Sequence, residues 1–392
     1  MTTALCFLMA LSAWGAYFYG NSFYLYALTE QGLGSVTEIS GAISVGFWMA
    51  IPASVMVGMV FDRYGRRHGA KLVAIYGALA LSAGLFLLAQ ADTVWQIYGA
   101  YMLMGSAYPA LSTPAISATL LQRVPPARYQ WSLSLALTGA SVGGAVAAPL
   151  LVFLSDKHGF GSALLSVAVG IAVLVIPLAL LVLRPRDIAA SELSTASAAA
   201  ATQTLRAVIS QGPFLLIFAI ALISLSAQVG FLAHQISILT VSLTPDQASL
   251  TVTLTAVTAA FGRFAFAALV TRIGLRPTAM LTYATMGTGT ALVGLSEQAI
   301  MMVIGSGIMG LSVGAVVMLP PLMCRAAFPP AFFGRVFGLI SIAVYAGGGL
   351  GPAITGIARD LSASAQAGLF TVAGLSILAM ALAARLTVDQ RT

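Results

Sequence analysis

Residues 58–67 read Gly-Met-Val-Phe-Asp-Arg-Tyr-Gly-Arg-Arg, and this charged stretch decides how the chain around it folds. It separates two apolar runs, 38–61 and 70–90. A helix of about 20 residues, rising 1.5 Å per residue, crosses the hydrocarbon core of a bilayer. Each run is therefore long enough to span a membrane. We predict that residues 62–67 form a tight loop between the two spans, with Gly65 permitting the turn.

The same length criterion selects ten further runs. In lipid, every backbone N–H and C=O group has to be bonded within the protein, so each run is predicted to be a helix. The predicted fold class is an all-α polytopic membrane protein with twelve transmembrane helices. The predicted spans are 4–27, 38–61, 70–90, 94–121, 130–154, 161–183, 212–240, 248–271, 277–296, 299–322, 336–357 and 365–386.

The composition agrees with a chain surrounded by lipid. Hydrophobic residues make up 59% of the 392 residues and charged residues only 7%, whereas a soluble domain carries about 25% charged residues. The formal net charge of +7 comes without a basic face interleaved with aromatic residues, so we expect no nucleic-acid partner. The first 11 residues lack a basic region, which favours a first span over a removed signal peptide.

Few residues offer catalytic chemistry. The three histidines, His68, His158 and His234, form no cluster with Asp or Glu at metal-ligand spacing. Cys6 and Cys324 lie in apolar surroundings and are interpreted as packing residues. No Lys-Ser/Thr pair follows the glycine runs, so a nucleotide-binding loop is not expected. We therefore predict no enzyme activity, no metal and no cofactor.

Residues 185–211 divide the twelve spans into two sets of six, 1–184 and 212–392. This segment is rich in Ser, Thr and Ala and carries several charges, which is typical of a solvent-exposed linker. We predict two six-helix bundles joined by this linker.

The two sets of spans also repeat each other. Arg63 and Gly65 recur as Arg272 and Gly274, with a constant offset of 209 residues (272 − 63 and 274 − 65). Two halves related by such a repeat are a known plan for transporters, in which the substrate site lies between the halves near the midplane.

The basic residues predict the orientation. If the spans are correct, 15 of the 18 Lys and Arg residues fall on one side of the membrane, Lys157 and Arg359 fall on the other, and Arg263 lies within a span. Cytoplasmic loops carry the excess of Lys and Arg. Both termini and the linker are therefore expected in the cytoplasm, with the protein in the cell (inner or plasma) membrane.

The 58–67 stretch carries a resemblance to a known family. It follows a Gly-x-x-x-Asp-Arg-x-Gly-Arg-Arg pattern, which resembles the signature of the loop between spans 2 and 3 in the major facilitator superfamily. The resemblance implies two six-helix halves and a role in conformational change for the residues of the motif. These residues are Gly58, Asp62, Arg63, Gly65, Arg66 and Arg67.

Within that superfamily, the chain is most similar to the monocarboxylate-transporter and oxalate/formate-exchanger group. Arg128 precedes a glycine-rich span 5, span 7 contains a histidine, and Arg263 in span 8 lines up with the group's substrate-binding arginine. The group usually has an acidic or polar residue four positions earlier, where this chain has Ala259, and this departure puts proton coupling in doubt. The resemblance assigns carboxylate binding to Arg263 and a gating role to Arg128.

Arg263 is also the most informative residue by physical argument. By the predicted boundaries it is the only charged residue well inside a span, and an arginine at the membrane centre costs about 2.5–3.5 kcal/mol on insertion scales. All 11 acidic residues fall in loops or near span ends, so no protein carboxylate is placed to neutralise it. A guanidinium binds a carboxylate through two parallel hydrogen bonds, so a carboxylate substrate is the simplest partner. The alternative is an arginine that reaches the interface or bonds backbone carbonyls.

Other polar and aromatic residues within spans are candidate substrate contacts. His234 could titrate near neutral pH, or could simply bond a neighbouring helix. Span 4 is expected to bend at Pro109 and Pro114. For each tyrosine, packing competes with ligand binding. The candidates besides Arg263 are His234, Gln235, Asn21, Tyr24, Tyr108 and Tyr345, with Gln228 on the same helical face as Gln235.

Glycine runs in spans 5 and 11 allow close approach of helix backbones. Because these spans contact the opposite half in the family fold, we expect the glycines to form the surface along which the halves move. They are Gly139, Gly143, Gly144, Gly347, Gly348, Gly349 and Gly351.

Together these features predict a secondary carrier of small organic anions that resemble monocarboxylates. It would work by alternating access as a monomer within the bilayer, and by either proton symport or anion exchange. A drug or metabolite efflux carrier of the same fold is the alternative, although the absence of membrane Asp and Glu disfavours cationic substrates. A membrane enzyme or receptor is a third class, disfavoured by the lack of a catalytic cluster.

Overall fold

The computed structural model describes residues 1–183, 212–328 and 333–386, and these are almost entirely helical. The elements are α1 (Thr2–Ser12), η1 (Ala13–Tyr19), α2 (Gly20–Glu30), α3 (Val36–Ala89), α4 (Val94–Leu111), α5 (Thr113–Arg123), α6 (Pro126–His158), α7 (Phe160–Val182), α9 (Gly212–Leu239), α10 (Pro245–Ile273), α11 (Leu275–Leu295), α12 (Ala299–Val316), α13 (Leu319–Ala327), α14 (Phe333–Ser362) and α15 (Ala365–Ala383). The predicted fold class is confirmed. The predicted linker 185–211 lies outside the described residues and stays a prediction.

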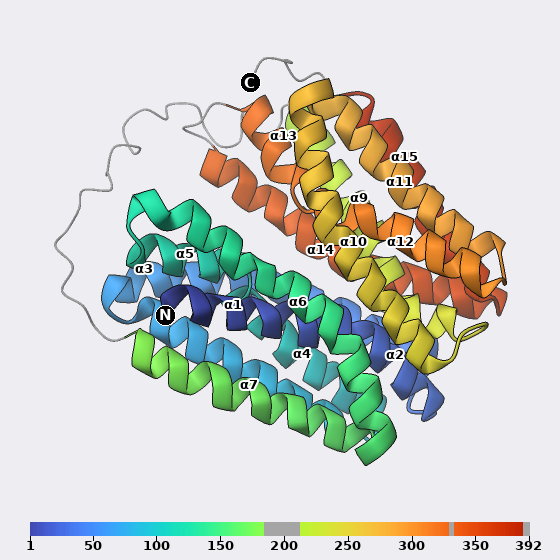
Figure 1. The fold of residues 1–392 in the computed structure, drawn as a ribbon, viewed down its shortest axis with the longest axis horizontal. Coiled ribbons are helices and arrows are strands. Elements are labelled where there is room, and N and C mark those ends of the chain that lie inside the picture. Colours follow the sequence, from blue (N-terminus) through green and yellow to red (C-terminus); the bar gives the residue numbers. More distant parts are fainter. Residues whose placement is uncertain (184–211, 329–332, 387–392) are drawn as a thin grey trace.

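The helices gather into two groups, α1–α7 with η1 and α9–α15, which lie side by side in Figure 1. Within the described ranges, ten helical segments are long and apolar enough to cross a membrane. The two other predicted spans, 94–121 and 277–296, are also helical and pack against α3 and α12, respectively. We call the α1–α7 group the N-half and the α9–α15 group the C-half.

Capping fixes where several helices begin. The Ser35 hydroxyl accepts from the Glu38 N–H at 3.2 Å, and the Glu38 carboxylate accepts from the Ser35 N–H at 2.8 Å. This capping box satisfies backbone donors that the first turn of a helix leaves free. Equivalent boxes at Thr93–Gln96 and Thr244–Gln247 start α4 and α10. All three boxes lie at the same end of the molecule, where the chain turns back into the bundle.

The 58–67 stretch keeps helical geometry through the predicted loop, because α3 runs without interruption from Val36 to Ala89. The chain nevertheless reverses, since a Cβ on Gly69 would lie 3.2 Å from the Phe61 Cα, whereas eight residues of straight helix span about 12 Å. Gly69, which lies outside the 58–67 motif, therefore makes the close contact between the two limbs of α3. The side chains of Asp62, Gly65, Arg66 and Arg67 lie outside the described part of the structure.

The turn at residues 62–69 lies at one end of the bundle, which we call the basic end. The start of α6 at Pro126 and the start of α14 at Phe333 lie at the same end. The opposite end carries the three capping boxes and the turns near 159 and 363.

Two helices are broken in corresponding places of the two halves. Span 4 is interrupted at Ser112, whose extended backbone (φ −103°, ψ −168°) separates α4 from α5. Span 10 is interrupted between α12 and α13, and prolines follow both breaks. The expected bend of span 4 is thus present, because a proline removes a helical hydrogen bond and clashes with the preceding turn.

The glycines of α6 lie elsewhere than expected. A Cβ on Gly143 would lie 2.9 Å from the Gly15 backbone nitrogen, and Gly139 meets Phe7, so both pack against span 1 of their own half. The prediction that they face the opposite half was wrong. In α14 the glycines divide, since Gly347 meets α9 within the C-half and Gly348 meets Phe47 of the N-half at 3.0 Å. The glycine run of α14 thus makes close contacts both within the C-half and with the N-half.

Candidate functional site

A cavity of about 350 Å³ lies between the two halves. Helices from both halves line it, and both helix breaks contribute, through Thr113 in the N-half and through Val317 and Met318 in the C-half. Six aromatic side chains form much of its wall, namely Trp14, Phe18, Tyr19, Phe47, Tyr108 and Tyr345. The strongest polar groups of the lining are Arg263 and Gln228.

A π-helical segment places the span 1 aromatics in the cavity wall. In η1 the backbone N–H of Gly20 bonds Gly15 O, five residues earlier, in place of Ala16 O. The freed Ala16 carbonyl accepts a hydrogen bond from the Tyr24 hydroxyl at 2.8 Å. Such π segments occur frequently at functional sites, because the extra residue in the turn rotates the helix surface.

Tyr24 therefore has a structural partner and does not line the cavity in this conformation. Its hydroxyl is buried and supports the π segment that presents Trp14, Phe18 and Tyr19. Asn21 and Tyr24 were both predicted as substrate contacts, but neither lines the cavity. Tyr19, at the end of the π segment, lines it instead.

Replacing Tyr24 by Phe should therefore weaken both the fold and ligand binding. The change leaves a buried carbonyl without its donor, which costs about 1–3 kcal/mol. We expect a lower unfolding temperature and a reduced affinity for any ligand held by the span 1 aromatics. Tyr26→Phe is the control, because Tyr26 lies in the same helix and is only partly buried. Equal unfolding temperatures for the two variants would contradict the role of the Tyr24 hydroxyl.

Tyr108 lies at the centre of the aromatic wall. Its ring centroid is 5.3 Å from that of Trp14, 5.2 Å from Tyr17 and 6.3 Å from Phe47. It also meets Tyr345 of the C-half edge-on, with centroids 6.5 Å apart. Tyr108 and Tyr345 were both predicted as site residues, and the structure brings them together across the two halves.

Arg263 reaches the cavity from the middle of α10. A Cβ on Gly314 of α12 would lie only 3.0 Å from the Cβ of Arg263. The absence of a side chain at Gly314 therefore makes room for Arg263. Arg263 and Tyr19 of the N-half both line the cavity. Among the described residues, no carboxylate pairs with Arg263 and no acidic side chain lines the cavity. Its guanidinium therefore provides the positive charge of the cavity wall.

The side-chain amide of Gln228 also lies in this wall. Neither its Oε1 nor its Nε2 has a hydrogen-bond partner among the described residues, although the residue is fully buried. Buried polar groups are almost always bonded, so a free donor and a free acceptor beside a cavity indicate a place for a polar ligand.

His234 lies away from the cavity, in a polar cluster that joins the halves. Arg359 Nη1 lies 2.8 Å from His234 Nδ1, and Arg359 Nη2 donates to Ser237 Oγ at 2.9 Å. A guanidinium has no acceptor, so Nδ1 has to accept and the proton of the neutral ring is on Nε2. That Nε2 lies 3.2 Å from both Pro352 O and Ser40 Oγ of the N-half.

Arg359 was predicted to lie just beyond span 11, on the side opposite most basic residues. The structure has it at that end, but α14 extends to Ser362 and carries Arg359 on its last turn, half-buried against α9. Next to it, the Asp360 carboxylate accepts from the Thr37 N–H at 2.9 Å, at the first turn of α3. A carboxylate is favoured there because helix N-termini present free N–H groups.

These contacts close the opposite end of the molecule. The Ser22 hydroxyl accepts from the Ile236 N–H at 2.8 Å, and Trp48 Nε1 donates to Ala346 O at 3.3 Å near mid-height. The hydrogen bonds described between the halves thus run from the opposite end to the middle. The cavity lies on the basic-end side of them.

The remaining predicted residues are dispersed. Gln235 donates to Thr255 Oγ1 at 2.7 Å and does not line the cavity. Asn21 is fully buried with no described partner for either amide atom, and it too does not line the cavity. At Gly58 a Cβ would meet no atom within 4 Å, so this residue makes no close contact with another helix. Arg63 and Arg128 are exposed at the basic end.

The fold defines a class of protein, a polytopic helical membrane protein with a cavity between its two halves. The chain matches the Major Facilitator Superfamily over residues 5–242 and 222–392, and it belongs to that superfamily. It is therefore a transporter and not an enzyme.

Individual relatives are more distant. The chain is 30% identical over 138 residues to multidrug resistance protein MdtG of Serratia proteamaculans (strain 568), which covers 35% of this chain and 32% of that protein. MdtG of Klebsiella pneumoniae (strain 342) matches to the same extent. The match spans about a third of the length of these relatives.

Solved structures agree with the fold over nearly the whole chain. The nucleoside transporter NupG superimposes with a TM-score of 0.75 at 15% identity, covering 99% of this chain and 98% of that one. A bacterial homolog of the human lysosomal transporter Spinster, in an inward-facing and unoccupied conformation, gives 0.74 at 14% identity, covering 97% and 94%. At these identities the likeness concerns the fold.

Proposed function

We propose that this transporter is a secondary carrier of small organic anions that works by alternating access. The observation that carries the proposal is Arg263, a guanidinium in the wall of the central cavity with no carboxylate partner among the described residues. An unpaired cation within the membrane costs several kcal/mol, and a substrate carboxylate removes that cost through a bidentate contact. This favours the monocarboxylate-like substrate class suggested by the sequence.

The rest of the wall suggests the shape of the substrate. One guanidinium provides for one carboxylate, and the free amide of Gln228 provides for one further polar group. The aromatic side chains around Tyr108 offer flat apolar faces to the body of the molecule. A compact monocarboxylate with an apolar or planar body and a second polar group fits this set.

The contacts between the halves also suggest a conformational state. If the basic end is cytoplasmic, as the excess of Lys and Arg favours, then the closed end faces outward and the cavity faces inward. The superposition on an inward-facing structure supports this proposal. Opening the outer side requires separation of the contacts made by Asp360, Trp48 and the His234 cluster. Because one chain contains the whole cavity, we propose that it functions as a monomer.

The His234 cluster provides a route for proton coupling, which the sequence left open. In the closed state His234 has to be neutral, because Nδ1 accepts from the Arg359 guanidinium. A proton arriving at Nδ1 removes that acceptor and sets two cations side by side. We propose that protonation from outside opens the outer contacts, and that closure releases the proton.

A matched set of ligands tests the substrate class. Thermal unfolding of the purified protein is measured with benzoate, benzamide and benzylammonium, which share one ring and differ in charge. Ligands that bind the folded state raise its unfolding temperature, so we expect a shift with benzoate that exceeds those of the other two. A shift as large with benzylammonium would contradict the organic-anion proposal. Aliphatic monocarboxylates tested alongside define the size of the substrate.

Efflux is the second candidate function, and the similarity to MdtG over 138 residues favours it. The two candidates share the cavity and differ in direction and in substrate range. With its guanidinium and aromatic wall, the cavity suits anionic or neutral compounds better than cationic drugs. Accumulation of an organic acid inside inside-out vesicles, without uptake by right-side-out vesicles, would favour efflux.

A further inference from the structure

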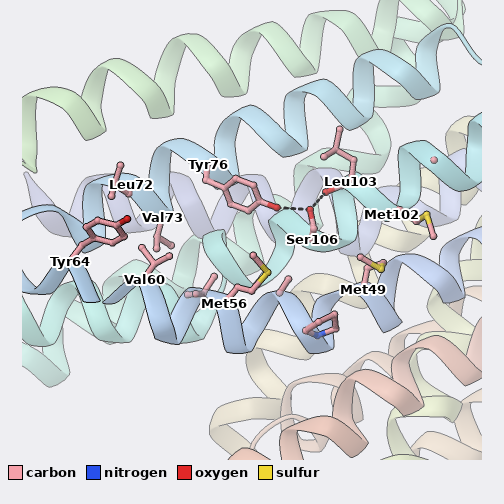
Figure 2. Close-up of a pocket in the computed structure, with 14 residues that line it drawn as sticks. Met49, Met56, Val60, Tyr64, Leu72, Val73, Tyr76, Met102, Leu103 and Ser106 are labelled. Atoms are coloured by element: carbon pink, nitrogen blue, oxygen red, sulfur yellow. Dashed lines mark hydrogen bonds between the residues drawn. The ribbon is translucent and has the colours of Figure 1, made fainter. Parts of the chain in front are cut away.

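A second and larger hollow lies on the flank of the N-half, away from the central cavity. Its volume is about 710 Å³, and it is bounded by both limbs of α3 and by α4. Figure 2 shows its wall extending from Tyr64 and Leu72 to Met49 and Met102. We call this hollow the flank groove. None of the residues assigned above to the central cavity lines it.

The wall of the flank groove is apolar and open to the surroundings. Met56 is 60% exposed, and Tyr76 and Met102 are 47% and 44% exposed. The Tyr76 hydroxyl donates to Ser106 Oγ at 2.8 Å, and Ser106 Oγ donates to Leu103 O at 2.7 Å. The polar atoms of this pair thus find partners within the wall. A hydrocarbon chain can lie there without leaving these hydroxyl groups unpaired.

The length of the groove suits one leaflet of a bilayer. The 15 helical steps between Met49 and Tyr64 correspond to roughly 22 Å at 1.5 Å each. Half of a hydrocarbon core is about 15 Å. A single acyl chain that enters at the basic end is therefore accommodated along its full length. Methionines suit such a lining, because their side chains adapt to irregular shapes.

Positive charge lies at one end of the groove. The Arg63 guanidinium carbon lies 5.9 Å from the centre of the Tyr64 ring, which lines the groove. Lys71 is adjacent in sequence to Leu72, another lining residue. Basic residues where an apolar surface meets the membrane interface attract anionic lipid headgroups. The charge of this end therefore complements a phosphate group above an acyl chain.

We propose that the flank groove is a binding site for an anionic phospholipid of the leaflet at the basic end. One acyl chain occupies the groove between the limbs of α3 and α4. The phosphate lies at the level of Arg63 and Lys71. The site is independent of the central cavity, so it does not depend on the organic-anion proposal.

The test uses the full-length protein in a neutral detergent. Thermal unfolding is titrated with phosphatidylglycerol and with phosphatidylcholine of the same acyl chains, and retained lipid is identified by native mass spectrometry. We expect saturable stabilisation by phosphatidylglycerol at a concentration at least about tenfold lower than for phosphatidylcholine. Glycerol phosphate, which has the headgroup charge without chains, should have no effect.

Two variants test separately the contacts of the lipid's acyl chain and those of its headgroup. Gly99 lines the groove, and a Cβ there meets no atom within 4 Å, so Gly99→Phe should fill the groove without disturbing the fold. Gly170→Phe is its control, since Gly170 is equally open but lies in α7. Arg63→Gln with Lys71→Gln removes the charge, and Arg272→Gln, at the repeated position of the C-half, is its control.

Both test variants should weaken phosphatidylglycerol binding at least about tenfold, while both controls bind like the parent protein. Three results would overturn the proposal. They are equal affinity for the two lipids, stabilisation by glycerol phosphate alone, and phosphatidylglycerol binding by Gly99→Phe that equals the binding by Gly170→Phe.

Discussion

The Arg263→Gln variant is expected to lose carboxylate affinity by roughly 100-fold or more, and with it measurable uptake. Truncating one partner of a buried, hydrogen-bonded charge pair costs about 2–5 kcal/mol, and each 1.4 kcal/mol is a factor of ten in affinity. Gln can still donate one hydrogen bond to a carboxylate, but it cannot provide the charge or the second parallel bond. The measurements are ligand-dependent unfolding and uptake of labelled substrate into proteoliposomes.

The same substitution should stabilise the empty protein. Without ligand, Arg263 is a cation within the membrane that has no described carboxylate partner, and its removal relieves a cost of about 2.5–3.5 kcal/mol. We therefore expect a higher unfolding temperature of the ligand-free protein together with a lower affinity. This combination separates a binding residue from a structural one, because loss of a structural arginine lowers both.

Arg272→Gln is the matched control, because Arg272 is exposed nine residues later in the same helix. It should resemble the parent protein in unfolding and in carboxylate binding. Full transport by Arg263→Gln, or an unfolding temperature below that of the parent, would refute the assignment of Arg263 to the substrate carboxylate.

The second large effect is expected at the outer contacts. His234→Gln should abolish substrate accumulation driven by an imposed pH gradient, while exchange of labelled for unlabelled substrate at equal pH persists. A Gln amide can accept from Arg359 with its oxygen and donate to Pro352 O with its nitrogen, so it imitates the neutral ring. It cannot take up a proton, and the closed state loses its response to pH.

The readout is accumulation in proteoliposomes with an acidic exterior, compared with exchange in the same preparation. His158→Gln is the control. His158 ends α6 at the same end of the molecule as the His234 cluster, but it does not belong to that cluster. Undiminished gradient-driven accumulation by His234→Gln would show that the proton is carried elsewhere. If the pH gradient drives no accumulation by the parent protein, anion exchange is the favoured mechanism.

The helical spans were predictable because a bilayer imposes a simple requirement on the backbone. A run of about 20 apolar residues has one way to satisfy its N–H and C=O groups in hydrocarbon, which is a helix. All twelve predicted spans are therefore helical along the described chain, although spans 4 and 10 are broken and span 1 contains a π segment. Arg263 was predictable for a related reason, since one charge within an apolar run stands out without knowledge of its neighbours.

The contacts of the other candidate residues were not predictable, because they depend on local helix geometry and on neighbours far away in sequence. Tyr19, at the end of the π segment Ala13–Tyr19, lines the cavity, whereas the predicted contacts Asn21 and Tyr24 do not. The partner of His234 is Arg359, 125 residues away, on a turn of α14 beyond the predicted span end.

That the chain crosses the membrane as paired sets of helices, and that an arginine lies inside one of them, follows from the amino-acid sequence alone. Length and hydropathy suffice for this, because the surrounding lipid acts on each segment separately. The packing of the helices sets which side chains share the cavity, which helix ends close the opposite end, and where a groove opens toward lipid. Those features arise between helices, where small residues, helix breaks and one π-helical turn set the spacing that no single segment encodes.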